Sequence, residues 1–173
     1  MRLVQQVLSA EASVALDHLD GAALSEDDWA RLARTMGEIA EAPLVIAEAT
    51  GTPDVIAAAA QALTTRPLAR LLVVDAVGED IPASLAALRA LATTTGVWVL
   101  ALVGPEPGRQ PGELDERDAD DADLHLRIHR DVLHGPQGDQ AGQADLVITR
   151  NRYGPAARVP VTFQGQYSRF VDC

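Results

Sequence analysis

Hydrophobic positions recur at helical spacing in the N-terminal part of the chain. In residues 3–19, and again after Ser25, apolar side chains return every three or four positions, which is the period of an amphipathic helix. Ser25 is a favourable N-cap residue, and Asp28 stands where a capping box needs its acidic partner. The pattern predicts one helix over residues 3–19 and a second that begins after Ser25. The predicted buried stripe of the second helix is Trp29, Leu32, Met36 and Ile39.

Short apolar runs alternate with further helical segments up to about residue 103. These runs lack polar alternation, which is typical of strands that are buried on both faces, as in a parallel sheet. The predicted strands span residues 44–46, 71–75 and 97–103, and the predicted helices span residues 52–63 and 81–95, with Gly96 closing the last helix. The alternation of strands and helices predicts an α/β fold with a parallel sheet.

The last third of the chain has a different pattern. Residues 104–121 are rich in proline, glycine and then acidic residues, so we expect a solvated loop there. The apolar runs at 124–128, 146–149 and 159–163 have no long helix between them, which predicts an antiparallel, hairpin-like C-terminal part. In the first of these runs polar and apolar residues alternate, the pattern of a half-exposed strand.

Charge and composition exclude several classes of function. The 173 residues fit a single domain, with a net charge of −11, and all 14 basic residues are arginine. Without lysine, these residues contain no phosphate-loop lysine and no Schiff-base lysine. The acidic balance argues against non-specific binding of nucleic acid or anionic membranes. No apolar run is long enough to cross a bilayer, so we expect a cytoplasmic protein with no membrane association.

Several segments, taken in order, resemble the C-terminal RecA-like ATPase domain of the DnaB-type replicative DNA helicases. The most specific segment is the tail, where Arg150-x-Arg152-x-Gly-Pro is followed by the ending Gly-Gln-Tyr-Ser-Arg-Phe at 165–170. The other segments that carry the resemblance are residues 8–12, 24–29, 43–46, 71–75, 129–131, 144–149 and 161–164. The resemblance implies a RecA-like, P-loop-NTPase-type sheet over residues 1–173 that is truncated relative to the family.

The resemblance also implies roles for three residues. Asp75 corresponds to the Walker B carboxylate, which helps to hold Mg²⁺ near ATP, and its position after a predicted strand suits that role. Arg150 and Arg152 correspond to a pair that reaches in trans to the ATP of a neighbouring subunit, in the manner of an arginine finger. Without the family, Asp75 is equally an ordinary loop or cap aspartate, and the arginines are equally solubilising residues of a strand.

Departures from the family pattern matter as much as the matches. No G-x-x-x-x-G-K-[ST] loop is present, and the family's catalytic glutamate has no counterpart in these residues. Val103-Gly104 replaces a polar pair that contains a phosphate-sensing glutamine, and the loop that is basic in the family is shortened and acidic over 104–121. We therefore expect no ATP hydrolysis and no cofactor for this chain alone, although the family uses ATP and Mg²⁺. We expect weak or absent binding of nucleic acid.

Three functional hypotheses remain open from the sequence. The first is a degenerate helicase relative that acts through protein contacts, either with a helicase subunit or by self-association. The second is a downstream fragment of a genuine ATP-dependent 5′–3′ DNA helicase of replication, with a misassigned start. The third is an unrelated α/β interaction domain. A metal site is expected only as Mg²⁺ at Asp75, because His125 and His129 lie about 13 Å apart along a strand and a site from His129, Asp131 and His134 is less plausible than a polar loop.

Overall fold

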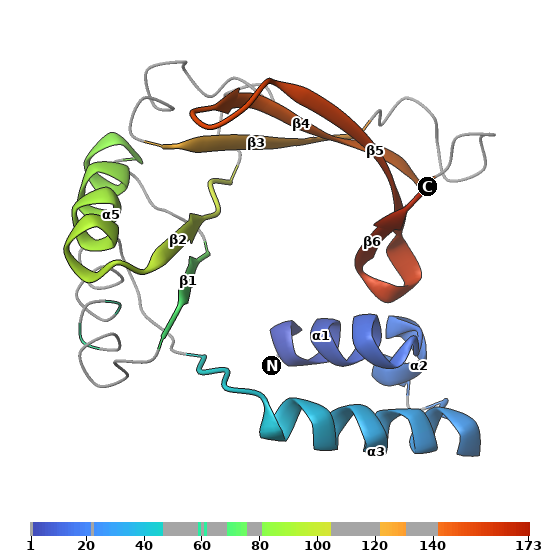
Figure 1. The fold of residues 1–173 in the computed structure, drawn as a ribbon. Helices are drawn as coiled ribbons and strands as arrows, with labels where there is room; N and C mark the ends of the chain where they lie inside the picture. The colour runs from blue at the N-terminus through green and yellow to red at the C-terminus, as the bar shows by residue number, and fades with distance from the viewer. Residues whose placement is uncertain are drawn as a thin grey trace. The chain divides into compact units, whose positions relative to one another are not determined.

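The computed structural model describes residues 2–21, 23–46, 59, 61, 69–75, 81–104, 122–130 and 142–173. The predicted helix at 52–63 and the predicted loop at 104–121 lie almost wholly outside these residues. The described elements are α1 (Arg2–Ala12), α2 (Leu16–Gly21), α3 (Glu26–Glu41), β1 (Leu71–Val74), α5 (Ile81–Thr95), β2 (Trp98–Ala101), β3 (Leu124–His129), β4 (Gln143–Asn151), β5 (Ala157–Gln164), η1 (Gly165–Tyr167) and β6 (Arg169–Asp172), as Figure 1 shows.

The chain divides into two compact units. The first unit contains Met1–Val45, Arg127–Val147 and Ala157–Cys173, so its helices and its C-terminal strands come from opposite ends of the sequence. The second unit contains Ile46–Leu126 and Ile148–Ala156. The α/β class predicted from the alternation of patterns is confirmed, because the structure has a parallel and an antiparallel pair of strands together with helices.

The single helix predicted over residues 3–19 is wrong, because the chain forms two helices there. Between α1 and α2, Ser13 adopts a left-handed conformation with φ of 52°, which ends the first helix. The break turns Val14 inward, where it packs with Ala12 and Leu32 in a buried cluster. The hydroxyl of Ser9 donates a 2.6 Å hydrogen bond to the carbonyl of Val14 and so satisfies the turn. Apolar burial therefore outweighs helix continuity at this position.

The capping box predicted at Ser25 is confirmed at the start of α3. The amide of Asp28 donates to the Ser25 hydroxyl at 3.1 Å, and the Ser25 amide donates to the Asp28 carboxylate at 3.1 Å. The Ser25 amide, then the Ser25 hydroxyl and the Arg31 guanidinium lower the pKa of Asp28 to about 2. Asp28 therefore contributes stability above its unfolded-state pKa, and that stability is lost as the pH falls towards 2.

Replacing Ser25 by alanine should lower the free energy of unfolding by about 1 kcal/mol at neutral pH, because an orphan amide of the first helical turn loses its acceptor. Urea denaturation at pH 7 measures this loss. The same measurement repeated from pH 5 downwards should show wild-type stability falling as Asp28 becomes protonated, with a smaller fall in the variant. Equal stability of both proteins at pH 7 would show that the cap does not stabilise α3.

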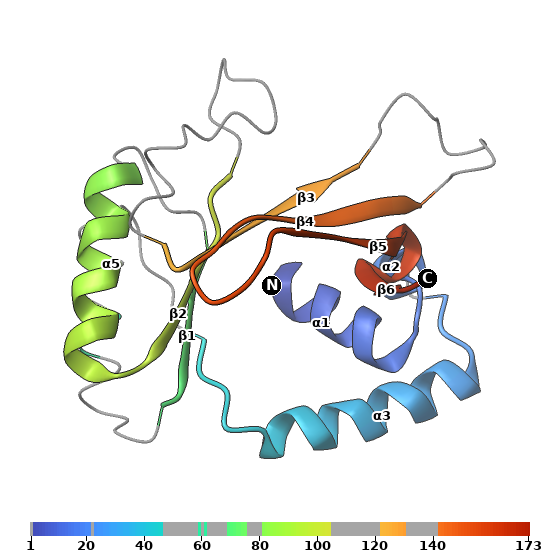
Figure 2. The ribbon, with the colours of Figure 1, turned by 45° about the horizontal axis from the view of Figure 1, so that its top comes forward.

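The buried stripe predicted for α3 is only partly right. Of its four members, Leu32 is buried, whereas Trp29 and Met36 are exposed by 61% and 56%. The buried face instead consists of Asp28, Leu32 and Thr35, which α3 turns towards α1, and Figures 1 and 2 both show α1 lying alongside α3. Each exposed residue directly follows a buried one in the sequence, so it lies about 100° further round the helix. The polar capping residue, rather than the tryptophan, sets which face is inside.

The second unit contains a parallel strand pair and one long helix. β1 and β2 pair in parallel register, and α5 contacts β2. The helix predicted at 81–95 is confirmed, and Gly96 follows it with φ of 71°, a left-handed conformation that suits glycine. The strand predicted at 97–103 is shorter than expected. Residues 44–46 are not a strand, because in the described part of the chain β1 pairs with β2 alone and this run has no ladder partner.

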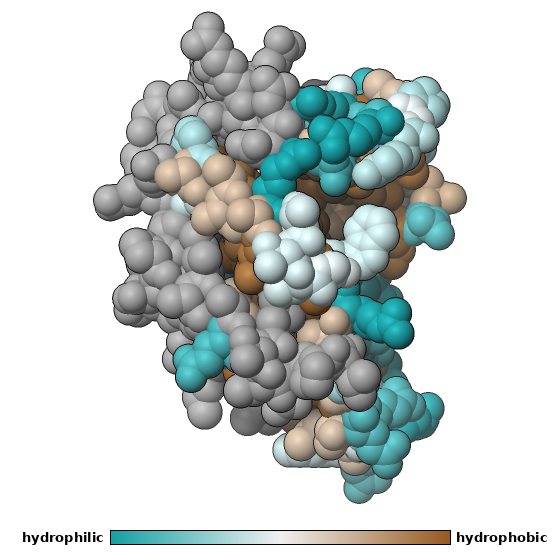
Figure 3. All heavy atoms as spheres, turned by 60° about the vertical axis from the view of Figure 1, so that its left-hand side comes forward, coloured by the Kyte–Doolittle hydropathy of each residue, from teal (hydrophilic) through white to brown (hydrophobic). Residues whose placement is uncertain are grey.

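The prediction that these strands are buried on both faces is wrong. Leu71 and Val73 of β1 are exposed, and so are their register partners Trp98 and Leu100 of β2. Because alternate residues of a strand share a face, these four side chains form one exposed apolar face. Figure 3 shows hydrophobic residues among hydrophilic ones on the face of the molecule that it draws. Val74, on the opposite face, is buried.

The C-terminal strands confirm the predicted antiparallel part. Their order in the sheet is β3-β4-β5-β6, and β5 pairs antiparallel with β6 from Val161 opposite Asp172 to Gln164 opposite Arg169. The short strand β6 was not predicted. The alternation predicted for β3 is present, but its apolar residues Leu124, Leu126 and Ile128 are the exposed ones.

Candidate functional site

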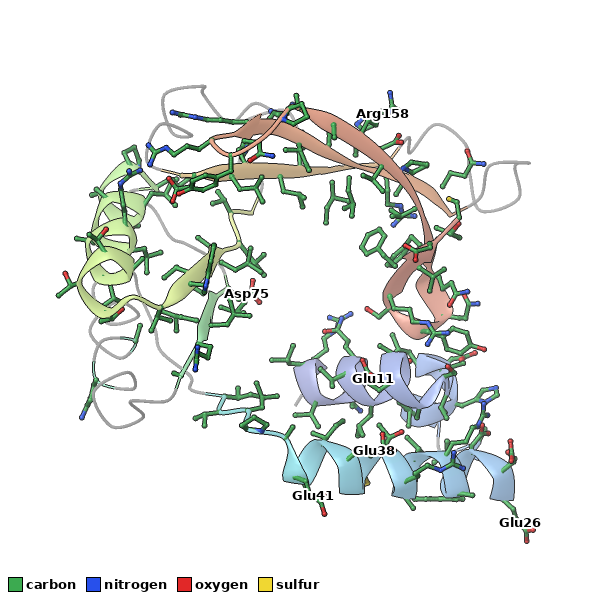
Figure 4. The ribbon with its side chains drawn as sticks, in the orientation of Figure 1. Glu11, Glu26, Glu38, Glu41, Asp75 and Arg158 are labelled. Atoms are coloured by element: carbon green, nitrogen blue, oxygen red, sulfur yellow. The ribbon has the colours of Figure 1, made fainter. Side chains whose placement is uncertain are left out.

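Asp75 lies at the carboxyl end of a parallel strand. Asp75 directly follows β1 and is exposed, and Figure 4 labels its side chain at the end of that strand. The segment that follows β2 lies next to the end of β1, because the amide of Leu102 donates a 2.8 Å hydrogen bond to the carbonyl of Val74. Carboxyl edges of parallel strands are where α/β proteins place ligand-binding side chains. The position of Asp75 therefore suits a carboxylate that binds a metal ion next to phosphate groups.

The two candidate arginines lie in different structural elements. Arg150 is the penultimate residue of β4, whereas Arg152 follows the strand in a turn. Two residues at positions i and i+2 of one strand would point to the same side of the sheet, but Arg152 lies beyond the end of β4, so the spacing does not align the two arginines.

The turn that carries Arg152 is organised by Asn151. The Asn151 carboxamide oxygen accepts a 3.0 Å hydrogen bond from the Tyr153 amide, the pattern of an Asx turn. Gly154 lies so close that a Cβ there would meet the side-chain nitrogen of Asn151, Nδ2, at 2.9 Å. The Arg-Asn-Arg-Tyr-Gly-Pro segment therefore forms a tight turn and also carries the guanidinium of Arg152.

Arg152 is held by Asp123, a residue that the sequence did not single out. The Arg152 amide donates to the Asp123 carbonyl at 2.8 Å, and the Arg152 Nη1 lies 2.5 Å from the Asp123 Oδ1. Between β4 and β3, the Thr149 hydroxyl and the His125 Nδ1 lie 2.6 Å apart. Asp123 ends a run of acidic residues, so only knowledge of the β3–β4 pairing could have distinguished it from the others.

The three predicted site residues share one compact unit, but the structure does not pair Asp75 with Arg152. Asp75, Arg150 and Arg152 all belong to the second compact unit. Among the described residues, no hydrogen bond or ion pair joins Asp75 to Arg152, whose side chain is paired with Asp123 instead. The carboxylate and the turn arginine are therefore separate features in the conformation described.

The described residues contain no cluster suited to a protein-held metal. No group of three histidine, cysteine, aspartate or glutamate side chains could hold an ion in the part of the chain that the structure describes, and Asp131 and His134 lie outside it. A single carboxylate is nevertheless compatible with Mg²⁺, which keeps most of its water and is often bound by one or two carboxylates together with substrate phosphates. Asp75 fits that role only where other groups hold the phosphates.

No protein-family model matches the chain, but individual proteins do. It is 32% identical over 193 residues to the replicative DNA helicase DnaB of Leifsonia xyli subsp. xyli, a match that covers 98% of this chain and 42% of that protein. The DnaB helicase of Mycobacterium leprae is 31% identical over 197 residues, covering 98% of this chain and 32% of its own length. Both aligned regions are longer than the chain, so these relatives carry residues within the match that it lacks.

Two solved structures share the fold. One, described as an ATPase domain, superposes with a TM-score of 0.79 at 19% identity, covering 98% of this chain and 69% of that one. The other, a DnaB-like replicative helicase studied with its interactions with primase, superposes with a TM-score of 0.74 at 19% identity and covers 98% and 48%.

The comparisons confirm the predicted resemblance. The chain resembles the RecA-like ATPase domain of DnaB-type replicative helicases over nearly its whole length, and the expected α/β, RecA-like fold is correct. It spans less than half the length of the curated relatives that it matches. No helix among the described residues is both long and apolar enough to span a membrane.

Proposed function

We propose that this chain is a degenerate relative of the replicative helicase ATPase domain and acts through protein contacts rather than by hydrolysing ATP itself. The observation that carries the proposal is a mismatch within the related region. The tail with Arg150 and Arg152 is present, whereas the 173 residues contain neither a lysine nor a glycine-rich phosphate loop. Such a chain can offer a guanidinium to another protein's nucleotide but lacks the backbone cradle to hold its own.

Two further features support loss of the ATPase role. Val103-Gly104 stands at the end of the segment that follows β2 beside Val74, and neither of these two residues has a polar side chain that could sense a phosphate. The acidic residues of 104–121 repel phosphate and single-stranded DNA rather than attract them. A protein surface is therefore the more suitable target, and a helicase subunit with a complete phosphate loop is the partner that Arg152 suits.

The proposal is tested by mixing the purified chain with an intact helicase and following ATP hydrolysis. With the Leifsonia xyli DnaB helicase as the partner, the steady-state ATPase rate should change in proportion to the bound fraction of this chain. Arg152→Ala should remove the change, because the guanidinium that reaches the partner's phosphates is gone. Arg158→Ala is a matched control, since Arg158 is an exposed arginine of β5 that pairs with Asp145. An unchanged rate with the wild-type chain would refute the proposal.

A second candidate function is favoured by the exposed strand faces. Leu71, Val73, Trp98 and Leu100 form an apolar face of the kind that a larger ATPase domain would cover. On this second hypothesis, the chain is the downstream part of a genuine ATP-dependent DNA helicase. The genomic sequence upstream of the Met1 codon decides between the two: an in-frame glycine-rich loop with lysine supports the helicase, and an in-frame stop codon eliminates it.

A further inference from the structure

We propose that Asp123 is an internal competitor for the phosphate-binding guanidinium of Arg152. The site formed at the β4 turn then takes the polyphosphate group of a nucleoside triphosphate, and Asp123 occupies it until that group displaces the carboxylate. This inference rests on the proposed role of Arg152 and adds a residue that controls it.

The geometry gives Asp123 a fixed place beside Arg152. The 2.8 Å hydrogen bond from the Arg152 amide to the Asp123 carbonyl joins the two backbones whatever the side chains do. From that anchor the Asp123 carboxylate reaches the Arg152 Nη1 at 2.5 Å. A carboxylate and a phosphate use the same guanidinium edge for charge-assisted hydrogen bonds. The two anions therefore compete for one group.

Exposure makes this pair easy to open. The side chains of Arg152 and Asp123 are 45% and 49% exposed, so water screens their attraction. Exposed ion pairs contribute little free energy, and a polyphosphate carries several negative charges where the carboxylate carries one. A ligand of that class can displace Asp123 without unfolding the turn, because Asn151 holds the turn independently through the Tyr153 amide.

A second ion pair of the chain supplies the matched control. Arg158 of β5 and Asp145 of β4 also lie 2.5 Å apart, and their strands are neighbours in the sheet. Neutralising Asp145 changes the net charge by the same amount as neutralising Asp123, and it also releases a guanidinium. It does so outside the turn that carries Arg152. Any effect of charge alone should therefore be equal in the two variants.

The test is a calorimetric titration of the full chain with inorganic tripolyphosphate at low ionic strength. Asp123→Asn should bind about two- to fivefold more tightly than the wild type, the range that release of an exposed ion pair provides. Asp145→Asn should bind like the wild type. In an Arg152→Ala background, Asp123→Asn should have no effect, because the competing carboxylate and its target are then both absent. Asp123→Ser, a second uncharged replacement, should reproduce the asparagine result, and circular dichroism verifies the fold of each variant.

Several outcomes would overturn the inference. Equal tightening by Asp123→Asn and Asp145→Asn would mean that net charge alone is responsible. A gain that persists without Arg152 would place the anion elsewhere, and no measurable binding by any variant would mean that the turn holds no polyphosphate site. These results are independent of the mixing experiment. Tighter binding of tripolyphosphate together with an unchanged helicase rate would uphold the competitor and refute the role in trans.

Discussion

At physiological ionic strength, a fluorescent ATP analogue titrated with Mg²⁺ into the purified chain should show no saturable binding up to millimolar concentration, because salt and Mg²⁺ weaken the contact that free tripolyphosphate makes with Arg152 at low ionic strength. Phosphate binding in P-loop proteins depends on a nest of backbone amides and on a lysine that reaches the β- and γ-phosphates, and neither is encoded in these residues. What remains is one exposed carboxylate, Asp75, and an arginine already paired with Asp123. The net charge of −11 opposes a polyanion further.

The Leifsonia xyli DnaB helicase, titrated in parallel, is the positive control for the analogue. Saturable binding by this chain with a Kd below about 100 μM would contradict the expectation, since that affinity needs several well-placed contacts. It would imply an unconventional nucleotide site. Asp75→Asn and Arg152→Ala would then show whether that site uses the strand-end carboxylate or the turn.

Arg169→Met should lower the free energy of unfolding by about 2–4 kcal/mol, since hydrogen bonds to a charged group contribute about 1.5–3 kcal/mol each and their loss is partly offset by water. The Arg169 Nη1 donates to the carbonyl of Ala10 at 2.7 Å and to the Ser13 hydroxyl at 3.0 Å. Its Nε donates to the Gln164 side-chain oxygen at 2.8 Å. Methionine keeps much of the volume but donates none of these bonds, so the α1–α2 turn loses its tie to β6.

Urea denaturation measures this loss, with Arg158→Met as the matched control. Arg158 pairs with Asp145 at an exposed position, and replacing it should cost less than about 1 kcal/mol. A loss for Arg169→Met as small as that of the control would show that the contacts to Ala10 and Ser13 do not stabilise the fold. A loss only in the variant at Arg169 identifies the tail motif as structural.

Local rules predicted the elements whose signals are complete within a few residues. The capping box at Ser25 and the glycine after α5 are decided by backbone geometry nearby, and both are found where expected. The order of helices and strands was predicted well between residues 71 and 101, whereas the run at 44–46 is no strand. Burial was predicted less well. Trp29 and Met36 are exposed because the side of α3 that faces α1 depends on packing, which periodicity alone does not reveal.

The helix break at Ser13 shows another limit of local patterns. No proline or glycine marks it, and the left-handed serine is stabilised by contacts that the sequence presents far apart, including the Arg31 guanidinium on the Ser13 carbonyl at 3.2 Å. The candidate site has the same character. Arg150, Arg152 and Asp75 were found through the resemblance, whereas Asp123 needed the pairing of two strands. Residues that act through a partner distant in sequence are the ones that a single sequence leaves hidden.

The tie between Arg169 and the α1–α2 turn has a consequence for synthesis of the protein. Arg169 and Ala10 are separated by 159 positions, so the N-terminal helices emerge from the ribosome long before the residue that fastens them. Contacts of such separation form late and slow folding, because a long loop must close before they stabilise anything. The contacts of the N-terminal helices therefore stay incomplete until Arg169 has emerged as well. Emergence of the tail, rather than formation of the first helices, sets when this unit becomes native.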